Sequence, residues 1–269
     1  MTTTIDTLES EKSLSPSTVT AAQVRQYWER GWLVLPGVFS AEEVAGWDAE
    51  CQRLLASDLV HEDNLRTGFR AVDGKPMIER IDPVIDVSSV FASAVSDPRV
   101  LGPLAAIFGD AAVLFKDKLI FKLPGMSGYT MHQDQAWWQM CAADDILSVS
   151  IAIDGASADN GCLELFPGYH RSLLTPAGEL RNLSDDEVAK HIDVTTGEKI
   201  ATRPGDVVIF HSQTPHRSGA NTARHSRRSL YLTYTAARTG NLYAAHRDHY
   251  KTYVTANMTP EQKARKFFR

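Results

Sequence analysis

Residues 131–138 read MHQDQAWW and place a histidine and an aspartate two positions apart. If this stretch is a strand, His132 and Asp134 project from the same face and Gln133 from the other, because strand side chains alternate. An imidazole beside a carboxylate provides two possible ligands to a metal ion. Two ligands alone hold a metal weakly, and most His and Asp side chains lie on protein surfaces. The metal-site interpretation therefore requires a third ligand elsewhere in the chain.

The best source of a third ligand is the stretch PGDVVIFHSQTPHRSGAN, residues 204–221. Its pattern predicts a strand that ends near His211, followed by a turn that contains His216. Two histidines and one carboxylate on one face of a metal are typical of non-haem Fe(II) oxygenases, which keep the remaining positions open for a co-substrate and dioxygen. The alternative for His216 is an ordinary surface histidine in a loop.

A co-substrate with two carboxylates also needs a fixed cation, and arginine is suited to bidentate carboxylate binding. Arg227 and Arg228 open the predicted strand RRSLYLTY just downstream of His216. The spacing alone is equally compatible with a carboxylate clamp and with a solvated strand end.

Helical signals dominate the chain before residue 110. Apolar residues at helical spacing predict a helix that stops at Gly31, and a capping box of Ser40 and Glu43 predicts a second helix. A third helix is expected from its cap, Asp97, to Gly109. The stretch WLVLPGVF, between the first two helices, is expected to be a strand.

After residue 110 the sequence changes to short β-rich runs separated by turn signals, which predicts a sandwich or barrel flanked by the N-terminal helices. A second capping box, Ser184 with Glu187, predicts a short helix among the strands. The expected strands lie in AAVLFKDKLIFK, MHQDQAWW, ILSVSIAID, CLELF, EKIATR, VVIFHS and RRSLYLTYT.

The composition favours a globular protein with a small-molecule partner. The chain has 269 residues, 43% of them hydrophobic, and a net charge of −5 with interspersed signs, which provides no basic stripe for nucleic acid or an anionic membrane. Three cysteines without close spacing argue against a disulfide framework or a cysteine zinc site and favour the reducing cytoplasm. No signal peptide or long apolar segment is recognisable. We expect a disordered tail at residues 1–17 and one domain at 18–269.

Taken together, these motifs resemble the phytanoyl-CoA dioxygenase family of Fe(II)/2-oxoglutarate oxygenases. The resemblance rests on HQD at 132–134, PGDVVIFHSQTPH at 204–216 followed by RSGAN, and Arg227 downstream, with support from FKDKLIFKLPG and NGCLELFPGYHRS. It extends from about Val24 to Tyr234. It implies a mainly β fold with a double-stranded β-helix (jelly-roll or cupin-like) core at about 110–236, helical N-terminal support and a C-terminal helical segment. It also implies Fe(II), 2-oxoglutarate and O2 as cofactor and co-substrates.

Residue by residue, the resemblance implies that His132, Asp134 and His216 are iron ligands. It implies that Arg227 clamps the C5 carboxylate of 2-oxoglutarate and that Ser218 assists with its hydroxyl. Related halogenases have Gly or Ala at the carboxylate position, so the aspartate here implies a hydroxylase-type rather than a halogenating enzyme.

Four further residues are placed near this site. The resemblance implies that Lys118 and Tyr129 contact the co-substrate. Arg228 is expected on the opposite face of its strand from Arg227, because adjacent strand residues alternate. His211 is expected to be a neighbour of the site but not a ligand.

The substrate-facing side has several candidates with open alternatives. Trp138 either faces substrate or packs in the core, whereas Trp137 is expected to pack. Arg66, Arg70 and Arg80 form either an anion-binding wall over the iron or an exposed loop with ordinary charges.

Three other histidines are interpreted as structural or solvated. His170, in PGYHRS, is expected to be structural. His246 and His249 have helical spacing that could bind a metal, but a solvated helical face is the favoured interpretation.

The leading hypothesis is a hydroxylase that oxidises an unactivated C–H bond of a small polar metabolite, such as a phosphonate, an amino acid or a natural-product intermediate. In that reaction 2-oxoglutarate is converted to succinate and CO2. One alternative is a catalytically silent binding module, which predicts erosion of a ligand or of Arg227. The other is a cupin-like metalloenzyme that does not use 2-oxoglutarate and needs no arginine clamp.

Overall fold

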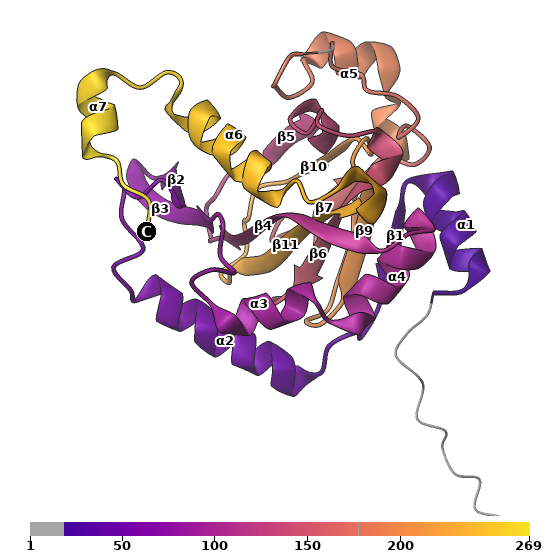
Figure 1. Ribbon diagram of the computed structural model, residues 1–269, viewed down its shortest axis with the longest axis horizontal. Coiled ribbons are helices and arrows are strands. Elements are labelled where there is room, and N and C mark those ends of the chain that lie inside the picture. The colour runs from indigo at the N-terminus through magenta and orange to yellow at the C-terminus, as the bar shows by residue number, and fades with distance from the viewer. Residues whose placement is uncertain (1–18, 177) are drawn as a thin grey trace, which may run out of the picture.

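The computed structural model describes residues 19–176 and 178–269, which form two antiparallel sheets with helices outside them (Figure 1). The predicted disordered tail, residues 1–17, lies outside the described residues. The two sheets form a jelly-roll core, so the prediction of a mainly β fold with flanking helices is confirmed.

The larger sheet has seven strands in the order β1-β9-β6-β11-β4-β3-β2. These strands are β1 (Trp32–Leu35), β2 (Thr67–Val72), β3 (Lys75–Ile81), β4 (Ala112–Lys122), β6 (Ile146–Ala152), β9 (Val207–His211) and β11 (Arg227–Ala236). The smaller sheet has four strands in the order β5-β10-β7-β8. They are β5 (Tyr129–His132), β7 (Leu163–Leu165), β8 (Glu198–Ile200) and β10 (His216–Ser218). The hairpin of β2 and β3 was not predicted from the sequence.

Helices α1 (Ala21–Arg30), α2 (Ala41–Leu55) and α4 (Pro98–Phe108) begin where the sequence predicts. Ser40 accepts a hydrogen bond from the backbone N–H of Glu43 at the start of α2, and Asp97 caps α4. Gly31 ends α1 with a φ of 93°, a left-handed conformation that glycine adopts without steric cost. The short helix α3 (Ser89–Val95) was not predicted.

The remaining helices lie later in the chain. Helix α5 (Asp185–His191) begins at the predicted capping box of Ser184 and Glu187. Helices α6 (Tyr243–Thr255) and α7 (Pro260–Arg265) form the predicted C-terminal helical segment. Figure 1 shows α2, α3 and α4 along one side of the larger sheet, and α6 leading to α7 beside β2 and β3. No helix within residues 19–176 and 178–269 has the length and apolar character needed to cross a membrane.

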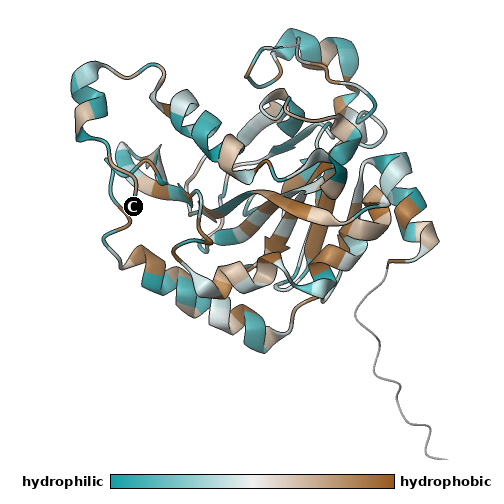
Figure 2. Ribbon diagram, viewed as in Figure 1, coloured by the Kyte–Doolittle hydropathy of each residue, from teal (hydrophilic) through white to brown (hydrophobic). Residues whose placement is uncertain are grey.

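Two apolar layers join these elements, and Figure 2 shows hydrophobic residues concentrated in the central strands and in bands on the helices. The first layer lies between the larger sheet and helices α1–α4, and each fully buried Leu or Phe in it contributes roughly 1.5–3 kcal/mol. The second layer lies between the two sheets. It contains Trp32, Ile120, Leu163, Leu165, Ile200, Val208, Phe210 and Tyr231.

Alternation along β4 and β11 determines which side chains enter the space between the sheets. Leu119 and Phe121 of β4 pack against the helices, whereas Ile120 packs between the sheets. Tyr231 of β11 also packs between the sheets, and its neighbour Leu230 packs against the helices. Side chains an even number of residues from Ile120 or Tyr231 therefore face the smaller sheet.

Candidate functional site

The three predicted metal ligands lie together at one end of the smaller sheet. His132 ends β5 and His216 begins β10, and the two residues are directly opposite each other in the antiparallel pair. Their ring centroids are 4.1 Å apart. One ligand atom from each of His132, Asp134 and His216 lies within 4.8 Å of the other two.

Two details of the local backbone differ from the prediction. Asp134 does not continue the strand but opens a 3-10 turn, Asp134–Ala136, and His216 lies in a short strand rather than in a turn. The turn is fixed by Gln135, whose backbone N–H donates to the carbonyl of Ser212 at 2.9 Å. Gln133 faces away from the cluster as expected, and its side-chain amide donates to the Gln213 carbonyl at 2.6 Å.

Hydrogen bonds set the histidine tautomers in a form that suits a metal. Nδ1 of His132 lies 2.7 Å from the carbonyl oxygen of Thr130, and Nδ1 of His216 lies 2.9 Å from that of Thr214. A carbonyl only accepts, so both Nδ1 atoms carry the proton and both Nε2 lone pairs remain for a metal. The Nε2 atoms of His132 and His216 lie 3.9 Å and 4.0 Å from Oδ1 of Asp134.

The protonation states agree with this geometry. Burial, assisted by His216, lowers the pKa of His132 to about 3, so its imidazole is neutral near pH 7. Burial would raise the pKa of the Asp134 carboxyl, but His216 and Lys118 hold it below its usual value. Ser148 donates a hydrogen bond of 2.7 Å to Oδ2 of Asp134 and leaves Oδ1 facing the histidines. Neutral imidazoles and an ionised carboxylate are the forms that bind Fe(II).

Two adjoining cavities meet at this cluster. The larger, which we call the front cavity, has a volume of about 470 Å³ and extends toward β2, β3 and α6. The smaller, which we call the rear cavity, has a volume of about 100 Å³ and extends between the sheets to Arg227 and Ser218. Residues that line both cavities are Lys118, Ile120, Tyr129, His132, Asp134 and Trp138.

Arg227 is a buried cation in the wall of the rear cavity. Arg227 is 3% exposed, and its Nε has no hydrogen-bond partner. No carboxylate of the described residues lies within ion-pair distance of its guanidinium. Arg228 points the other way, as predicted, and pairs with Asp154 at 2.7 Å and Asp48 at 2.6 Å. A buried guanidinium without a counter-ion is costly. The rear cavity therefore fits a ligand carboxylate, which is what 2-oxoglutarate would present there.

Comparison with known proteins agrees with the site geometry. The family profile of phytanoyl-CoA dioxygenase (PhyH) matches residues 27–229, which is most of the chain. The chain belongs to the phytanoyl-CoA dioxygenase family. It is a 2-oxoglutarate-dependent non-haem iron dioxygenase of the hydroxylase type, with Fe(II), 2-oxoglutarate and O2 as cofactor and co-substrates.

Individual relatives match over nearly the same length. Methylphosphonate hydroxylase of Gimesia maris is 28% identical over 236 residues, covering 84% of this chain and 84% of the relative. Ectoine dioxygenase of Streptomyces avermitilis is 28% identical over 246 residues, covering 82% of this chain and 80% of the relative. The crystal structure of EctD from S. alaskensis with 2-oxoglutarate and 5-hydroxyectoine has a TM-score of 0.71 at 22% identity. It covers 87% of this chain and 82% of EctD, and shows the same fold.

Membership of the phytanoyl-CoA dioxygenase family bears on the two alternative functions. A catalytically silent module predicts the loss of a metal ligand or of the arginine, but the cluster is complete and Arg227 is buried beside it. A cupin-like enzyme without 2-oxoglutarate gives no reason to bury that arginine unpaired. Neither alternative fits the site.

Lys118 and Tyr129, which the resemblance places near the co-substrate, lie where the two cavities join. The Tyr129 phenol donates a hydrogen bond of 2.8 Å to Glu79. The Lys118 ammonium lies 5.3 Å from the ring centroid of Tyr231. Within residues 19–176 and 178–269, no carboxylate forms an ion pair with Lys118. The Lys118 nitrogen is therefore available to a ligand that spans the junction, whereas the Tyr129 hydrogen is already donated to Glu79 and leaves only the phenol oxygen as an acceptor.

Both tryptophans of the opening motif line the front cavity. Trp138 is 6% exposed, packs edge-on against Phe115 at 5.9 Å, and also lines the rear cavity. Trp137 meets His132 edge-on at 5.9 Å. Trp137 packs against the apolar cluster of Phe115, Trp138 and Ile146, as expected, and the 3-10 turn also brings its indole to the same cavity wall as Trp138.

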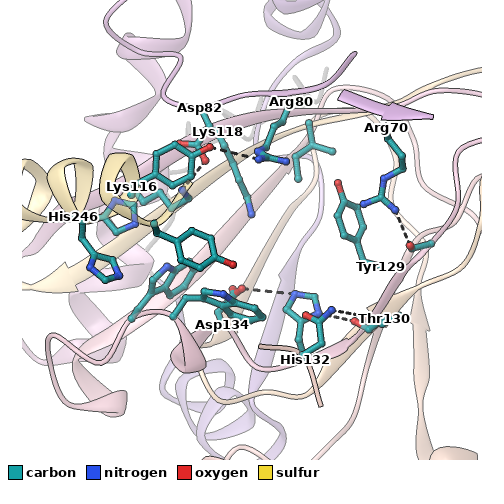
Figure 3. Close-up of a pocket in the computed structure, with 18 residues that line it drawn as sticks. Arg70, Arg80, Asp82, Lys116, Lys118, Tyr129, Thr130, His132, Asp134 and His246 are labelled. Atoms are coloured by element: carbon teal, nitrogen blue, oxygen red, sulfur yellow. Dashed lines mark hydrogen bonds and ion pairs between the residues drawn. The ribbon is translucent and has the colours of Figure 1, made fainter. Parts of the chain in front are cut away.

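The three candidate arginines separate into two roles. Arg70 and Arg80 lie on β2 and β3, line the front cavity and share Glu79 between them. Figure 3 shows them across the cavity from His132 and Asp134. Arg66 is not a wall residue, because it is 2% exposed and donates to the Pro83 carbonyl at 2.6 Å outside the cavity. None of the three lies in an ordinary exposed loop, so that alternative was wrong.

Helix α6 supplies a wall of the front cavity whose individual residues the sequence interpretation did not assign to it. The expectation of a solvated helical face was wrong for His246, which is buried; His249 is exposed as expected, but it also borders the front cavity, as do Tyr250 and Tyr253. His246 is 6% exposed, and its ring lies 4.5 Å from that of Phe115. The i, i+3, i+4, i+7 spacing of these four residues was the available signal.

The two other histidines lie outside both cavities. Nε2 of His170 lies 3.1 Å from the carbonyl oxygen of Trp28, and Nε2 of His211 lies 3.1 Å from Oδ1 of Asp144. Their rings are 5.3 Å apart in the contact between α1 and the strands. Both histidines therefore stabilise the packing of this region and do not face the metal cluster.

A buried ion pair in the wall of the front cavity was also missed. Nζ of Lys116 lies 2.6 Å from Oδ2 of Asp82, and both side chains are at least nine-tenths buried. Burial would raise the pKa of the Asp82 carboxyl, but Lys116 holds it below its usual value. Both residues line the front cavity.

Asp82→Asn is expected to lower the free energy of unfolding at pH 7 by about 3 kcal/mol or more, because it leaves the buried Lys116 ammonium without a counter-ion. The folded-state pKa of Asp82 is depressed, so its contribution is present above about pH 4 and is lost as pH falls through that depressed value. Denaturant unfolding of both proteins should show a stability difference that shrinks below about pH 4. A constant difference down to pH 2 would contradict the assignment.

Proposed function

We propose that this phytanoyl-CoA dioxygenase family member hydroxylates an unactivated C–H bond of a small, negatively charged metabolite, such as an alkylphosphonate or a related small acid. The observation that carries the proposal is the charge of the front cavity. Arg70 and Arg80 share one carboxylate, Glu79, and therefore keep a net positive charge. Lys118 lines the same cavity without an ion pair in the part of the chain that the structure describes, and burial lowers the pKa of its ammonium, so the positive charge of the cavity rests on the two arginines.

Cavity size and relatives support a small substrate. The front cavity of about 470 Å³ is within the range of about 300–1,000 Å³ that small-molecule sites occupy. Relatives include methylphosphonate hydroxylase and 2-aminoethylphosphonate dioxygenase, whose names specify small phosphonates. Ectoine dioxygenase specifies another small polar molecule.

In this proposal the residues divide the work by position. His132, Asp134 and His216 hold Fe(II), and Arg227 with Ser218 holds the distal carboxylate of 2-oxoglutarate. When bound, Fe(II), 2-oxoglutarate and O2 together supply the oxidant, and 2-oxoglutarate leaves as succinate and CO2. The protein's own contribution is to place the substrate carbon beside the metal and to exclude water.

Lys118 and Tyr129 contact the co-substrate where the cavities join. Trp138, Arg70 and Arg80 contact the substrate in the front cavity. Because the arginines lie across the cavity from the ligands, they would hold the anionic end of the substrate and direct its carbon toward the metal (Figure 3).

A succinate-release screen tests the proposal. The panel should contain alkylphosphonates, aminoalkylphosphonates, amino acids and uncharged analogues of matched size, and each hit should be checked for product mass. We expect anionic compounds to stimulate succinate release and to gain ~16 mass units, the mark of oxygen insertion. Preferential turnover of the uncharged analogues would contradict an anionic substrate, and a loss of ~2 mass units would indicate desaturation instead.

Arg80→Met is expected to raise the KM of the best anionic substrate by about 10-fold, equivalent to ~1.4 kcal/mol. The KM for 2-oxoglutarate should stay unchanged, because Arg80 lines only the front cavity. Steady-state kinetics with each compound varied in turn measure the two effects. Arg25→Met, on the exposed face of α1, is the matched control. Equal changes in both KM values would place Arg80 in a general structural role.

A further inference from the structure

Lys122 is a buried lysine directly behind the rear cavity. It ends β4 and is 1% exposed. Its Nζ donates to the hydroxyl oxygen of Ser218 at 2.8 Å, to the carbonyl of Gly161 at 3.3 Å and, more closely, to the carbonyl of Gly219. An ammonium has three N–H donors, so these three acceptors use all of them.

The position of Lys122 has an electrostatic cost that its packing does not explain. Lys122 and Arg227 are directly opposite each other in the β4–β11 pair, on the face that points to the smaller sheet. Like charges directly opposite each other destabilise a sheet. No carboxylate of the described residues forms an ion pair with either of them. Neither ion pairing nor packing therefore explains why a lysine stands at this position.

The contacts of Ser218 give the lysine a specific task. The Ser218 oxygen accepts from Lys122 Nζ and from the backbone N–H of Tyr129, at 2.8 Å and 3.3 Å. A hydroxyl has two acceptor lone pairs and one hydrogen, so with both lone pairs engaged its hydrogen remains to donate. Ser218 lines the rear cavity together with Arg227. The hydroxyl is therefore set as a donor toward whatever occupies that cavity.

We propose that Lys122 is a positioning residue, which fixes the Ser218 hydroxyl as a hydrogen-bond donor to the distal carboxylate of 2-oxoglutarate. The lysine itself does not line either cavity, so it acts through Ser218. This proposal rests on 2-oxoglutarate binding beside Arg227, as set out under the proposed function. A neutral lysine nitrogen can accept a hydrogen bond, so loss of its proton would let Ser218 donate backward and turn away from the cavity.

Gly161 shows how closely the lysine is held. Its φ is +73°, and a Cβ built there would lie 2.7 Å from Nζ of Lys122 and 2.3 Å from the carbonyl oxygen of Gly219. Gly161→Ala would therefore displace the ammonium without removing its charge. It provides a second way to break the contact between Lys122 and Ser218.

A double-mutant cycle tests the proposal. The Kd of 2-oxoglutarate is measured by anaerobic titration of the Fe(II)-loaded enzyme, following the visible band of the chelate, for Lys122→Met, Ser218→Ala and the double variant. Each single variant should weaken binding by about 10-fold, the lower range for a hydrogen bond to a charged group. The double variant should be no weaker than the singles, because both remove the same donor. Additive losses, or unchanged affinity in Lys122→Met, would overturn the proposal.

A second measurement needs no variant at residue 122. Burial, followed by Arg227 and Arg70, lowers the pKa of Lys122 to about 7. The other groups that face it are Glu79, Tyr129 and Cys162; burial raises the pKa values of Tyr129 and Cys162.

The affinity of the wild-type enzyme for 2-oxoglutarate should therefore fall as pH rises from 7 to 9, as Lys122 loses its proton. The affinity of Ser218→Ala should stay level across the same range. A level profile in the wild-type enzyme would overturn the proposal.

The outcomes separate this proposal from the proposed function. If Arg227→Ala leaves 2-oxoglutarate affinity intact, the rear cavity is not the co-substrate site and both proposals fail. If Arg227→Ala weakens binding but the cycle is additive, only the role of Lys122 fails. Gly161→Ala should reproduce the affinity loss of Lys122→Met, and thermal unfolding of every variant identifies any that do not fold.

Discussion

Arg227→Ala is expected to weaken the binding of 2-oxoglutarate by about 100-fold or more. Truncating one partner of a buried, hydrogen-bonded charge pair costs roughly 2–5 kcal/mol, and Arg227 is 3% exposed without a protein counter-ion. The loss should appear in Kd and in KM for 2-oxoglutarate. Iron affinity should change little, because the arginine is not among the cluster residues. Anaerobic titration with Fe(II) and then with 2-oxoglutarate measures the two affinities separately.

The adjacent arginine supplies the matched control. Arg228 lies on the same strand with its side chain on the opposite face, and pairs with Asp154 and Asp48. Arg228→Ala should lower thermal stability through these lost ion pairs and leave the affinity for 2-oxoglutarate within about 2-fold, because additivity holds for groups that share no partners. If the two variants lose co-substrate affinity equally, the effect comes from the strand and not from a clamp.

His132→Ala is expected to reduce 2-oxoglutarate consumption by more than about 100-fold. Even the hydrogen-bond partners of metal ligands typically contribute 10–100-fold to affinity or activity, and a ligand contributes more. The variant leaves Asp134 and His216 as a two-residue site, so Fe(II) affinity should fall in parallel. Succinate formation and Fe(II) binding are the two measurements.

His191→Ala, at the exposed end of α5, is the control for losing an imidazole that lines neither cavity. It should consume 2-oxoglutarate at the wild-type rate. A His132→Ala protein that retains that rate would exclude the cluster as the iron site.

The elements that the sequence predicts best are those with local chemical signals. The capping boxes at Ser40 and Ser184 and the glycine at Gly31 mark helix ends because they satisfy backbone groups that the helix leaves unpaired. The opposite orientations of Arg227 and Arg228 follow from strand alternation alone. His132 and Asp134 needed a third ligand and an arginine from distant strands before their spacing carried meaning.

The elements that were missed have polar side chains that face a cavity. A strand or helix with a polar face resembles a solvated surface, so the β2–β3 hairpin and the inner face of α6 gave no apolar pattern. Lys122 was overlooked although it lines neither cavity, because a lysine at the end of a strand resembles a solvated residue. Yet Lys118 and Lys122 both lie an even number of residues from Ile120, on the buried face of β4. Lysines repeated at even spacing inside a mainly apolar strand were the available signal.

Helix α6 has a consequence for altering the enzyme. The family profile ends at residue 229, whereas α6 spans Tyr243–Thr255, so this wall of the front cavity comes from a part of the chain that the family pattern does not specify. Substitutions at positions 246, 249, 250 and 253 would reshape the substrate side while leaving the metal cluster, Arg227 and Ser218 in place. A library confined to these four positions is therefore a direct route to redirecting the oxidation toward a different molecule without rebuilding the catalytic centre.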